Sequence, residues 1–249
     1  MTSEPWPPGP VWVVIPTYQE AENVAAMLGA VTGVLATSGI DGHVLVVDDG
    51  SPDGTAEIAR AVAAREPRVE VLCRPAKEGI GPAYREGFRH ALAAGAALVM
   101  EMDCDFSHDP EQVPVLVAAA RDADVVLGSR YVPGGGVARW GAMRRAISRA
   151  GCWYARTVLG VQTRDLTGGF KCFRRQVLEG IPLGEVTAAG YGFQVEMTYR
   201  ALLLGFRVAE VPITFRERER GRSKMGGSIV FEAAVLIPRL RARLRRAMR

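Results

Sequence analysis

The chain has 249 residues, of which 48% are hydrophobic and 23% charged, and its net charge is +4. This length and composition allow one well-buried core and exclude an intrinsically disordered protein. The four cysteines are scattered without a CxxC pair, which excludes a zinc ribbon and a disulfide framework and favours a reducing, cytoplasmic setting. No apolar run reaches the roughly 18 residues that cross a bilayer, and the N-terminus lacks a signal-peptide pattern.

Short apolar runs alternate with helical stretches after a Pro-rich start, residues 1–10, which we expect to be disordered. In the first half of the chain we expect strands at 11–15, 43–47, 69–73 and 98–102. Between them we expect a helix at 20–35, a helix capped by Asp53 that ends near 65, and a helix that ends near 94. After these we expect a helix from about 110, a strand at 125–128, helices at 141–158 and 192–204, and a strand at 206–211. Continuous apolar strands separated by helices predict an α/β fold with a mostly parallel, Rossmann-like sheet flanked by helices. We expect one domain over 11–228.

Polar segments follow three of these strands, at 16–20, at 48–49 and at 103–105. In parallel sheets, ligands bind beyond the carboxyl ends of the strands, so the three segments are expected to meet in one crevice. Asp103 and Asp105 would present two carboxylates to one divalent cation, and hard oxygen ligands suit Mg²⁺ or Mn²⁺. An Asp-x-Asp pair is common at helix starts too, so its place at a strand end is what favours a metal site.

The same segments carry a family resemblance. Residues 14–20, 47–55 and 102–108 resemble, in order and spacing, the inverting GT-A glycosyltransferases of family 2. Further blocks resemble the dolichol-phosphate (polyprenol-phosphate) mannose synthases, and they lie at 128–131, 144–149, 165–170, 190–196, 211–215 and 218–224. The resemblance covers roughly residues 11 to 228. It implies a GT-A fold in a single domain whose C-terminal half binds the acceptor, in a form without a C-terminal transmembrane domain.

The resemblance implies roles for individual residues. The residues that would hold the nucleotide sugar are Pro16, Tyr18, Glu20, Val47, Asp49, Asp103, Cys104, Asp105, Arg218 and Lys224. Asp105 would be the principal ligand of Mg²⁺ or Mn²⁺, and Ser107 occupies the place of the second metal contact. The family usually has Ala where this chain has Cys104; both are small, so we expect the turn to be kept.

Positive charge is expected where the two substrates meet, because one divalent metal cannot offset a diphosphate and a lipid phosphate together. Arg130, Arg144 and Ser148 are expected to bind the acceptor phosphate, and Asp105 and Arg130 to be catalytic; arginine suits bidentate phosphate contacts. Ser148 lies one helical turn after Arg144, so both can face one phosphate. A surface role in ion pairs is the alternative for these arginines.

The expected reaction is transfer of mannose from GDP-mannose to polyprenyl phosphate, with inversion and release of GDP. A phosphate monoester is already largely an oxyanion at neutral pH, so the reaction needs no general base, and we expect His108 to be a packing residue. One alternative is a polyprenyl-phosphate glucosyltransferase that uses UDP-glucose. A non-catalytic sugar-nucleotide-binding subunit is another, and nucleic-acid binding is disfavoured because the arginine cluster has no interleaved aromatic residues.

The segment 229–249 joins an apolar run to six arginines. It predicts either a helix at an anionic membrane surface or a helix that packs on the core with a solvated basic end. We expect a peripheral protein on the cytoplasmic, inner face of the cell membrane, with a separate integral membrane protein as a candidate partner.

Overall fold

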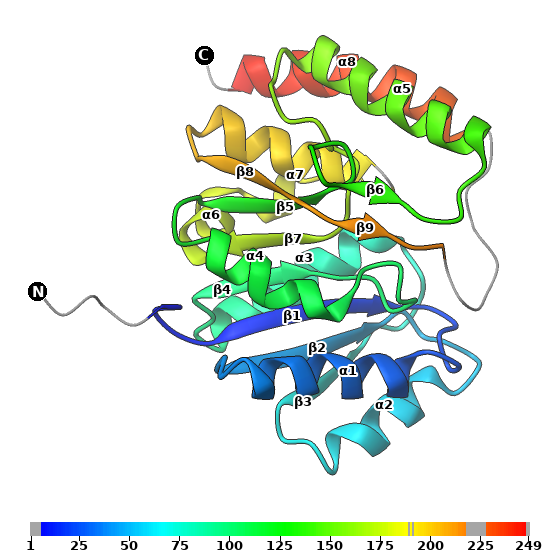
Figure 1. The fold of residues 1–249 in the computed structure, drawn as a ribbon, viewed down its shortest axis with the longest axis vertical. Helices are drawn as coiled ribbons and strands as arrows, with labels where there is room; N and C mark the ends of the chain where they lie inside the picture. Colours follow the sequence, from blue (N-terminus) through cyan, green and yellow to red (C-terminus); the bar gives the residue numbers. More distant parts are fainter. Residues whose placement is uncertain (1–5, 189, 191, 218–227, 248–249) are drawn as a thin grey trace, which may run out of the picture.

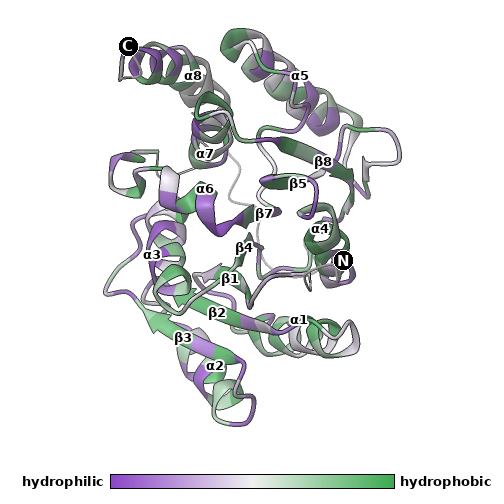
Figure 2. Cartoon of the chain, turned by 90° about the vertical axis from the view of Figure 1, so that its left-hand side faces the viewer, coloured by the Kyte–Doolittle hydropathy of each residue, from purple (hydrophilic) through white to green (hydrophobic). Residues whose placement is uncertain are grey.

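The computed structural model describes residues 6–188, 190, 192–217 and 228–247. Its main sheet has seven strands in the order β3-β2-β1-β4-β7-β5-β8, and it is covered by helices on both sides (Figures 1 and 2). The strands are β1 (Val11–Thr17), β2 (Gly42–Asp48), β3 (Val69–Cys73), β4 (Leu98–Glu101), β5 (Val125–Ser129), β7 (Lys171–Arg174) and β8 (Val208–Pro212). Every neighbouring pair is parallel except those of β7, which runs antiparallel to both β4 and β5.

Buried side chains alternate between the two faces of the sheet, as a strand requires. In β1, Val11, Val13 and Ile15 pack on one side, while Trp12 and Val14 pack on the other. The first side is covered by α1 (Val24–Thr37), α2 (Thr55–Ala63) and α4 (Val113–Ala119), and the second by α3 (Ile80–Ala93), α6 (Arg175–Gly180) and α7 (Gly192–Leu203). Two short 3-10 helices, η1 (Pro110–Gln112) and η2 (Leu183–Glu185), complete the layers. The expected α/β fold is confirmed.

The sequence did not predict one strand of the sheet, β7. Its sequence, Lys-Cys-Phe-Arg, is short and has a charged residue at each end, so no apolar run marks it. Lys171 is nevertheless fully buried, because its ammonium group donates to the backbone carbonyl and the side-chain oxygen of Gln194 at 2.7 and 2.6 Å. A tertiary contact therefore places a charged residue in the middle of the sheet. A separate pair, β6 (Gly136–Val137) with β9 (Thr214–Phe215), was also not expected.

Two helix starts differ from the prediction. The helix expected from residue 20 begins at Val24, because residues 20–23 form a turn. The N-cap of α2 is Gly54, with a positive φ of 85°, and not Asp53. The Asp53 carboxylate still accepts a hydrogen bond from the Thr55 backbone N–H at 3.2 Å. It therefore provides a partner for one of the free N–H groups at the start of α2, although it lies one residue before the N-cap.

The start of the described chain is packed. The Trp6 indole N–H donates to the Val117 carbonyl at 2.8 Å, and the ring lies against the core. The Pro10 carbonyl accepts hydrogen bonds from Ala97 and Leu98. Residues 6–10 thus belong to the folded domain, in contrast to the disorder expected over 1–10; residues 1–5 lie outside the described range.

A further layer lies beyond the edge of the sheet, where α5 (Ala142–Leu159) runs beside α8 (Ser228–Ala247) (Figure 1). Ile237, Leu240 and Leu244 of α8 are buried against side chains of α5 and α7. Arg243 of α8 donates to Glu196 of α7 at 2.6 Å. For residues 235–247 this packing agrees with the docked helix, one of the two roles left open for residues 229–249. Among the described helices, none combines the length and the apolar character that crossing a bilayer takes.

Candidate active site

The carboxyl ends of β1 and β2 are tied together by hydroxyl groups. The Asp48 carboxylate, almost fully buried, accepts hydrogen bonds from the Thr17 hydroxyl at 2.9 Å and from the Ser51 hydroxyl at 2.6 Å. The Ser51 oxygen in turn accepts from the Gln19 backbone N–H at 3.0 Å. These bonds fix the two expected nucleotide segments, 16–20 and 47–49, against each other.

Next to this link, the expected nucleotide residues occupy different environments. Asp49 is buried, and its carboxylate accepts a 2.5 Å hydrogen bond from Arg74, whose guanidinium also binds Glu78 and Glu86. Burial raises the pKa of Asp49, and Arg74 offsets this only in part. The Tyr18 ring lies under the ammonium group of Lys77 at 4.1 Å. The carboxyl ends of β1 and β2 thus present charged side chains beside the aromatic ring of Tyr18.

The remaining expected residues of this edge differ in their partners and burial. Glu20 accepts from the Asn23 amide at 2.8 Å, and its backbone N–H donates to the Thr55 hydroxyl at 2.9 Å. Pro16 is half-buried and Val47 fully buried. Val47 can therefore offer a ligand little more than its backbone.

The turn after β4 is held by its own side chains. The backbone N–H of Ser107 donates to the Asp105 carboxylate at 3.0 Å, across Phe106 in a left-handed conformation with φ of 59°. The backbone N–H of Asp103 donates to Nδ1 of His108 at 3.1 Å. His108 stacks on Phe170 with ring centroids 5.0 Å apart, and burial lowers its pKa. His108 is a packing and hydrogen-bonding residue, as expected.

Two oxygen atoms of this turn suit a divalent cation. Asp105 is buried, and the buried Ser107 hydroxyl has no hydrogen-bond partner among the described residues. A buried polar atom left without a partner is costly, so a ligand is the natural partner for this hydroxyl. The described residues contain no group of three His, Cys, Asp or Glu side chains placed to hold a metal. A cation here would thus have only a few protein ligands, and substrate oxygens and water would complete its coordination. Mg²⁺ is commonly bound in this way.

Cys104 fits the turn as a small side chain. It is buried, and burial raises the pKa of its thiol well above the usual value. The thiol therefore stays protonated at neutral pH and is not a competing soft ligand in its resting form.

A buried polar cluster lies behind the turn, on β4, β7 and α7. Both carboxylate oxygens of Glu101 and the Gln194 side-chain nitrogen are buried without a geometrically sound hydrogen bond to a described residue. Burial raises the pKa of Glu101 to about 7 and lowers that of Lys171 to about 8. This cluster was not expected, since three residues from distant segments give no local signal.

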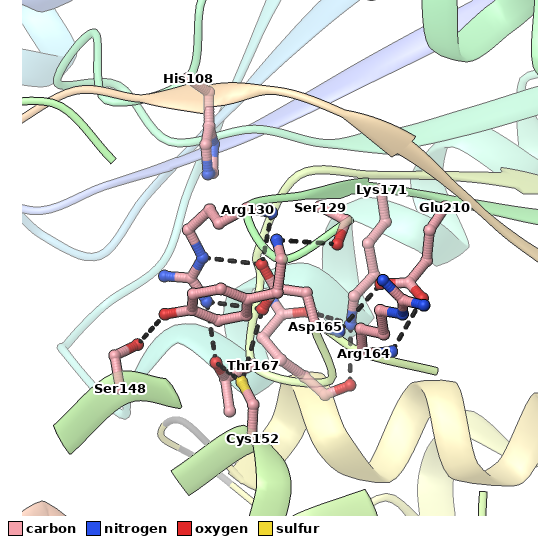
Figure 3. A network of polar contacts seen from close by, with 12 residues as sticks. His108, Ser129, Arg130, Ser148, Cys152, Arg164, Asp165, Thr167, Lys171 and Glu210 are labelled. Carbon is pink, nitrogen blue, oxygen red and sulfur yellow. Dashed lines mark hydrogen bonds and ion pairs between the residues drawn. The ribbon is translucent and has the colours of Figure 1, made fainter. Parts of the chain in front are cut away.

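The expected acceptor half is organised around Arg130, at the end of β5. Asp165 accepts hydrogen bonds from its Nε at 2.7 Å and from its Nη2 at 2.6 Å, and Thr167 accepts from Nη2 at 2.9 Å (Figure 3). Both charged groups are buried. Burial alone would lower the pKa of Arg130, but Asp165 outweighs it, so the pKa is raised; the pKa of Asp165 is correspondingly lowered.

Ser148 and Arg144 lie next to this pair. The Tyr131 hydroxyl donates to the Ser148 oxygen at 2.6 Å (Figure 3). Arg144 binds Glu217 at 2.7 Å. The Arg144 and Arg130 guanidinium carbons lie 4.2 and 5.8 Å from the centre of the Trp140 ring, so one buried indole faces both cations. The three expected acceptor residues are thus gathered in one region.

An aromatic side chain connects this region to the turn after β4. Phe215 lies 5.5 Å from the His108 ring and 5.4 Å from the Trp140 ring, and the Arg130 guanidinium lies 5.5 Å from it. The backbone N–H of Arg216 donates to the Ser107 carbonyl at 3.1 Å. Arg218 and Lys224, which were expected to contact the nucleotide sugar, lie outside the described residues.

The chain was compared with known proteins. The family model for glycosyl transferase family 2 matches residues 12–181. The chain belongs to this family. An undecaprenyl-phosphate mannosyltransferase from Micrococcus luteus is 48% identical over 92% of this chain and 93% of its own length. A polyprenol monophosphomannose synthase from Mycolicibacterium smegmatis is 46% identical over 94% of this chain and 89% of its own length. The family resemblance is therefore confirmed.

Solved structures give the fold of this family 2 glycosyltransferase. Glucosyl-3-phosphoglycerate synthase from Mycobacterium tuberculosis, in complex with Mn²⁺, uridine-diphosphate-glucose and phosphoglyceric acid, matches with a TM-score of 0.69. The match covers 93% of this chain and 79% of that chain, at 21% identity. At this identity the likeness shows the fold alone, and it confirms the expected GT-A architecture.

Proposed function

We propose that this family 2 glycosyltransferase is a polyprenol monophosphomannose synthase, which transfers mannose from GDP-mannose to a polyprenyl phosphate and releases GDP. The names of two relatives at 46% and 48% identity support the acceptor class and the sugar. The structural observation that carries the proposal is Phe215, which joins the Asp103–His108 turn to the cluster of Arg130, Arg144 and Ser148. A donor diphosphate and an acceptor phosphate both need sites, and these two regions would provide them.

The donor site in this proposal follows the carboxyl ends of β1, β2 and β4. Pro16, Tyr18, Glu20, Val47 and Asp49 would hold the guanosine, and Asp103, Cys104 and Asp105 would face the diphosphate and the sugar. Asp105 and Ser107 would hold Mg²⁺ or Mn²⁺, which offsets negative charge on the leaving diphosphate. Arg218 and Lys224 are proposed as further contacts to the donor.

The acceptor site in this proposal uses the free edge of the Arg130 guanidinium. Asp165 binds Nε and Nη2, and Nη1 makes no hydrogen bond to a described residue. Nη1 would donate to the acceptor phosphate, while Asp165 holds the fork in position. Ser148 and Arg144 would donate from α5, and Arg144 would exchange its half-exposed partner Glu217 for the phosphate.

The chemistry is an in-line attack by a phosphate oxygen on the anomeric carbon, which inverts that carbon as the bond to GDP breaks. The acceptor oxygen already carries negative charge at neutral pH, so the protein positions and neutralises rather than removing a proton. β7 lies between β4 and β5, so the Asp103–Asp105 turn and Arg130 follow strands two inter-strand spacings apart, about 9–10 Å. That separation is wide enough for a sugar between the donor diphosphate and the acceptor phosphate that these two regions would bind.

The test is an assay of the purified protein with labelled GDP-mannose or UDP-glucose and a short, water-soluble polyprenyl phosphate, with and without EDTA. We expect mannosyl transfer from GDP-mannose that EDTA abolishes and added Mg²⁺ or Mn²⁺ restores. Transfer from UDP-glucose alone would replace mannose by glucose in the proposal. No transfer from either donor, with donor binding retained, would instead favour a non-catalytic sugar-nucleotide-binding subunit.

A further inference from the structure

Helix α5 exposes large apolar side chains on its outer surface. Of the five large hydrophobic side chains that are exposed in the described part of the chain, three lie on this helix. Met143 is 74% exposed, Ile147 46% and Trp153 65%. At 3.6 residues per turn these three project within an arc of about 120°, with the exposed Ala146 and Ala150 between them. They form one apolar stripe, which we call the α5 outer face.

The opposite side of α5 is fixed to the domain, so the helix cannot turn to bury this stripe. Cys152, Ala155 and Leu159 are buried, and the last two pack in a cluster with α7 and α8. Ser148 accepts the hydrogen bond of Tyr131 on the same inner side. The exposure of the α5 outer face is therefore a property of the folded domain.

The charged residues of α5 itself have one sign, and one of them, Arg144, is paired with Glu217. The helix contains four arginines, at 144, 145, 149 and 156, and no acidic residue. Arg149 is exposed next to the stripe. The neighbouring α8 adds exposed arginines at 239, 245 and 246. An apolar stripe with an aromatic residue, flanked by arginines, is complementary to the headgroup layer of an anionic bilayer.

Residues 235–247 of α8 face the domain with their large apolar side chains. The apolar residues Ile237, Leu240 and Leu244 are buried in the domain, so they are unavailable to lipid. One of the two roles expected for the segment 229–249 was a membrane contact through its apolar run. Among residues 235–247 of α8, the most exposed long side chains are those of arginines such as Arg239, Arg245 and Arg246.

We propose that the α5 outer face docks this protein on an anionic lipid bilayer, with Met143, Ile147 and Trp153 in the headgroup region. The proposal deepens the proposed function and rests on it for its purpose, because Arg144 and Ser148 lie on the same helix as the stripe. The site for the acceptor phosphate then lies on the inner side of the helix that rests on the bilayer, about one helix diameter, 10–12 Å, from the stripe. A polyprenyl phosphate can reach it while its chain stays in the bilayer.

Vesicle flotation without any substrate tests the docking. The probes are vesicles of phosphatidylcholine alone and vesicles with about one third phosphatidylglycerol, the anionic lipid. We expect the wild type to bind the anionic vesicles and to be released by salt. The triple variant Met143→Ser, Ile147→Ser, Trp153→Ser should bind at least about tenfold more weakly. The control Val115→Ser, Leu204→Ser changes exposed apolar residues on other elements and should bind like the wild type.

Further measurements keep the outcome clear. Circular dichroism establishes that each variant is folded, and Arg149→Glu replaces the triple variant if that one is not. Undiminished binding of the folded variants, or an equal loss in the control, would overturn the proposal. So would a wild-type dimer that the triple variant converts to a monomer without any vesicle binding, since a second copy would then cover the stripe.

Turnover separates this proposal from the proposed function. With a short, water-soluble polyprenyl phosphate, the triple variant should keep the wild-type rate, while transfer to a long-chain acceptor in vesicles should fall about tenfold with binding. Equal rates of both proteins on the vesicle acceptor would contradict docking through α5. Absence of turnover in the wild type, with vesicle binding intact, would count against the proposed function alone.

Discussion

The two halves of the site handle charge in opposite ways. At the ends of β1, β2 and β4, the Asp48 and Asp105 carboxylates accept hydrogen bonds from backbone N–H groups and hydroxyls, whereas Asp49 is paired with Arg74. In the half built on β5, β7 and α5, the arginines are already paired with carboxylates, as Arg130 is with Asp165 and Arg144 with Glu217. An ion pair orients the cation before its substrate arrives.

The comparison also separates two kinds of ion pair. Arg130–Asp165 is buried, so Asp165 is a permanent partner that aims the guanidinium. Arg144–Glu217 is only partly buried, so a phosphate can displace Glu217 at low cost.

The largest effect is expected where the acidic half supplies a metal ligand. Asp105→Asn should lower kcat by roughly a thousandfold, because it removes several kcal/mol of charge stabilisation from the leaving diphosphate. The labelled-donor assay measures this, with circular dichroism to show an intact fold. Asp109→Asn is the matched control in the same turn, since an amide can still accept the hydrogen bond from Glu111. Equal loss in both variants would mean that the turn, and not the ligand, was damaged.

In the paired half, the main effect should be on stability. Asp165→Asn leaves the buried Arg130 without its counter-charge and should lower the free energy of unfolding by about 3–5 kcal/mol. Urea denaturation checks this. Glu179→Gln breaks the exposed pair of Glu179 with Arg175, also 2.7 Å long, and should cost less than about 1 kcal/mol. Similar losses in the two variants would contradict the difference between buried and exposed pairs.

The cluster behind the turn predicts a pH dependence. In the folded state the pKa of Glu101 is raised to about 7, so the folded protein binds more protons than the unfolded chain between the usual value of 4.5 and about 7. The free energy of unfolding should therefore fall as the pH rises through this window. Over this window the free energy of unfolding of the wild type should fall by about 1–3 kcal/mol more than that of Glu101→Gln, measured by urea denaturation at several pH values. Glu111→Gln, at an exposed site, should keep the wild-type profile; an unchanged slope in Glu101→Gln would refute the assignment.

The smallest effect is expected at the acceptor hydroxyl. Ser148→Ala should raise KM for polyprenyl phosphate about three- to tenfold and leave KM for GDP-mannose unchanged, because one hydrogen bond contributes about 0.5–1.5 kcal/mol. Steady-state kinetics with each substrate varied measure it. Thr157→Ala removes an exposed hydroxyl from the same helix and should change neither constant. A selective rise in the donor KM would move Ser148 out of the acceptor site.

The acidic half was the more predictable from sequence. Its strands are apolar runs, and each functional acid follows its strand directly, so local pattern and topology together placed Asp49, Asp103 and Asp105 at one edge. The other half depends on contacts between distant residues. Nothing near Arg130 in the sequence identifies Asp165, 35 residues later, as its partner, and nothing local marks Lys171 as buried. The block 165–170 was visible only as a resemblance, without a role for Asp165.

The antiparallel strand β7 also determines the order in which the sheet can assemble. β1, β2, β3 and β4 pair with one another within the first 101 residues, and β5 follows from residue 125. Yet β5 has no direct pairing with β4, since β7 fills the space between them. A chain emerging from the ribosome must therefore release residue 174 before the two halves join. Until then β4 has an open edge, a surface on which chaperones or neighbouring nascent chains could act.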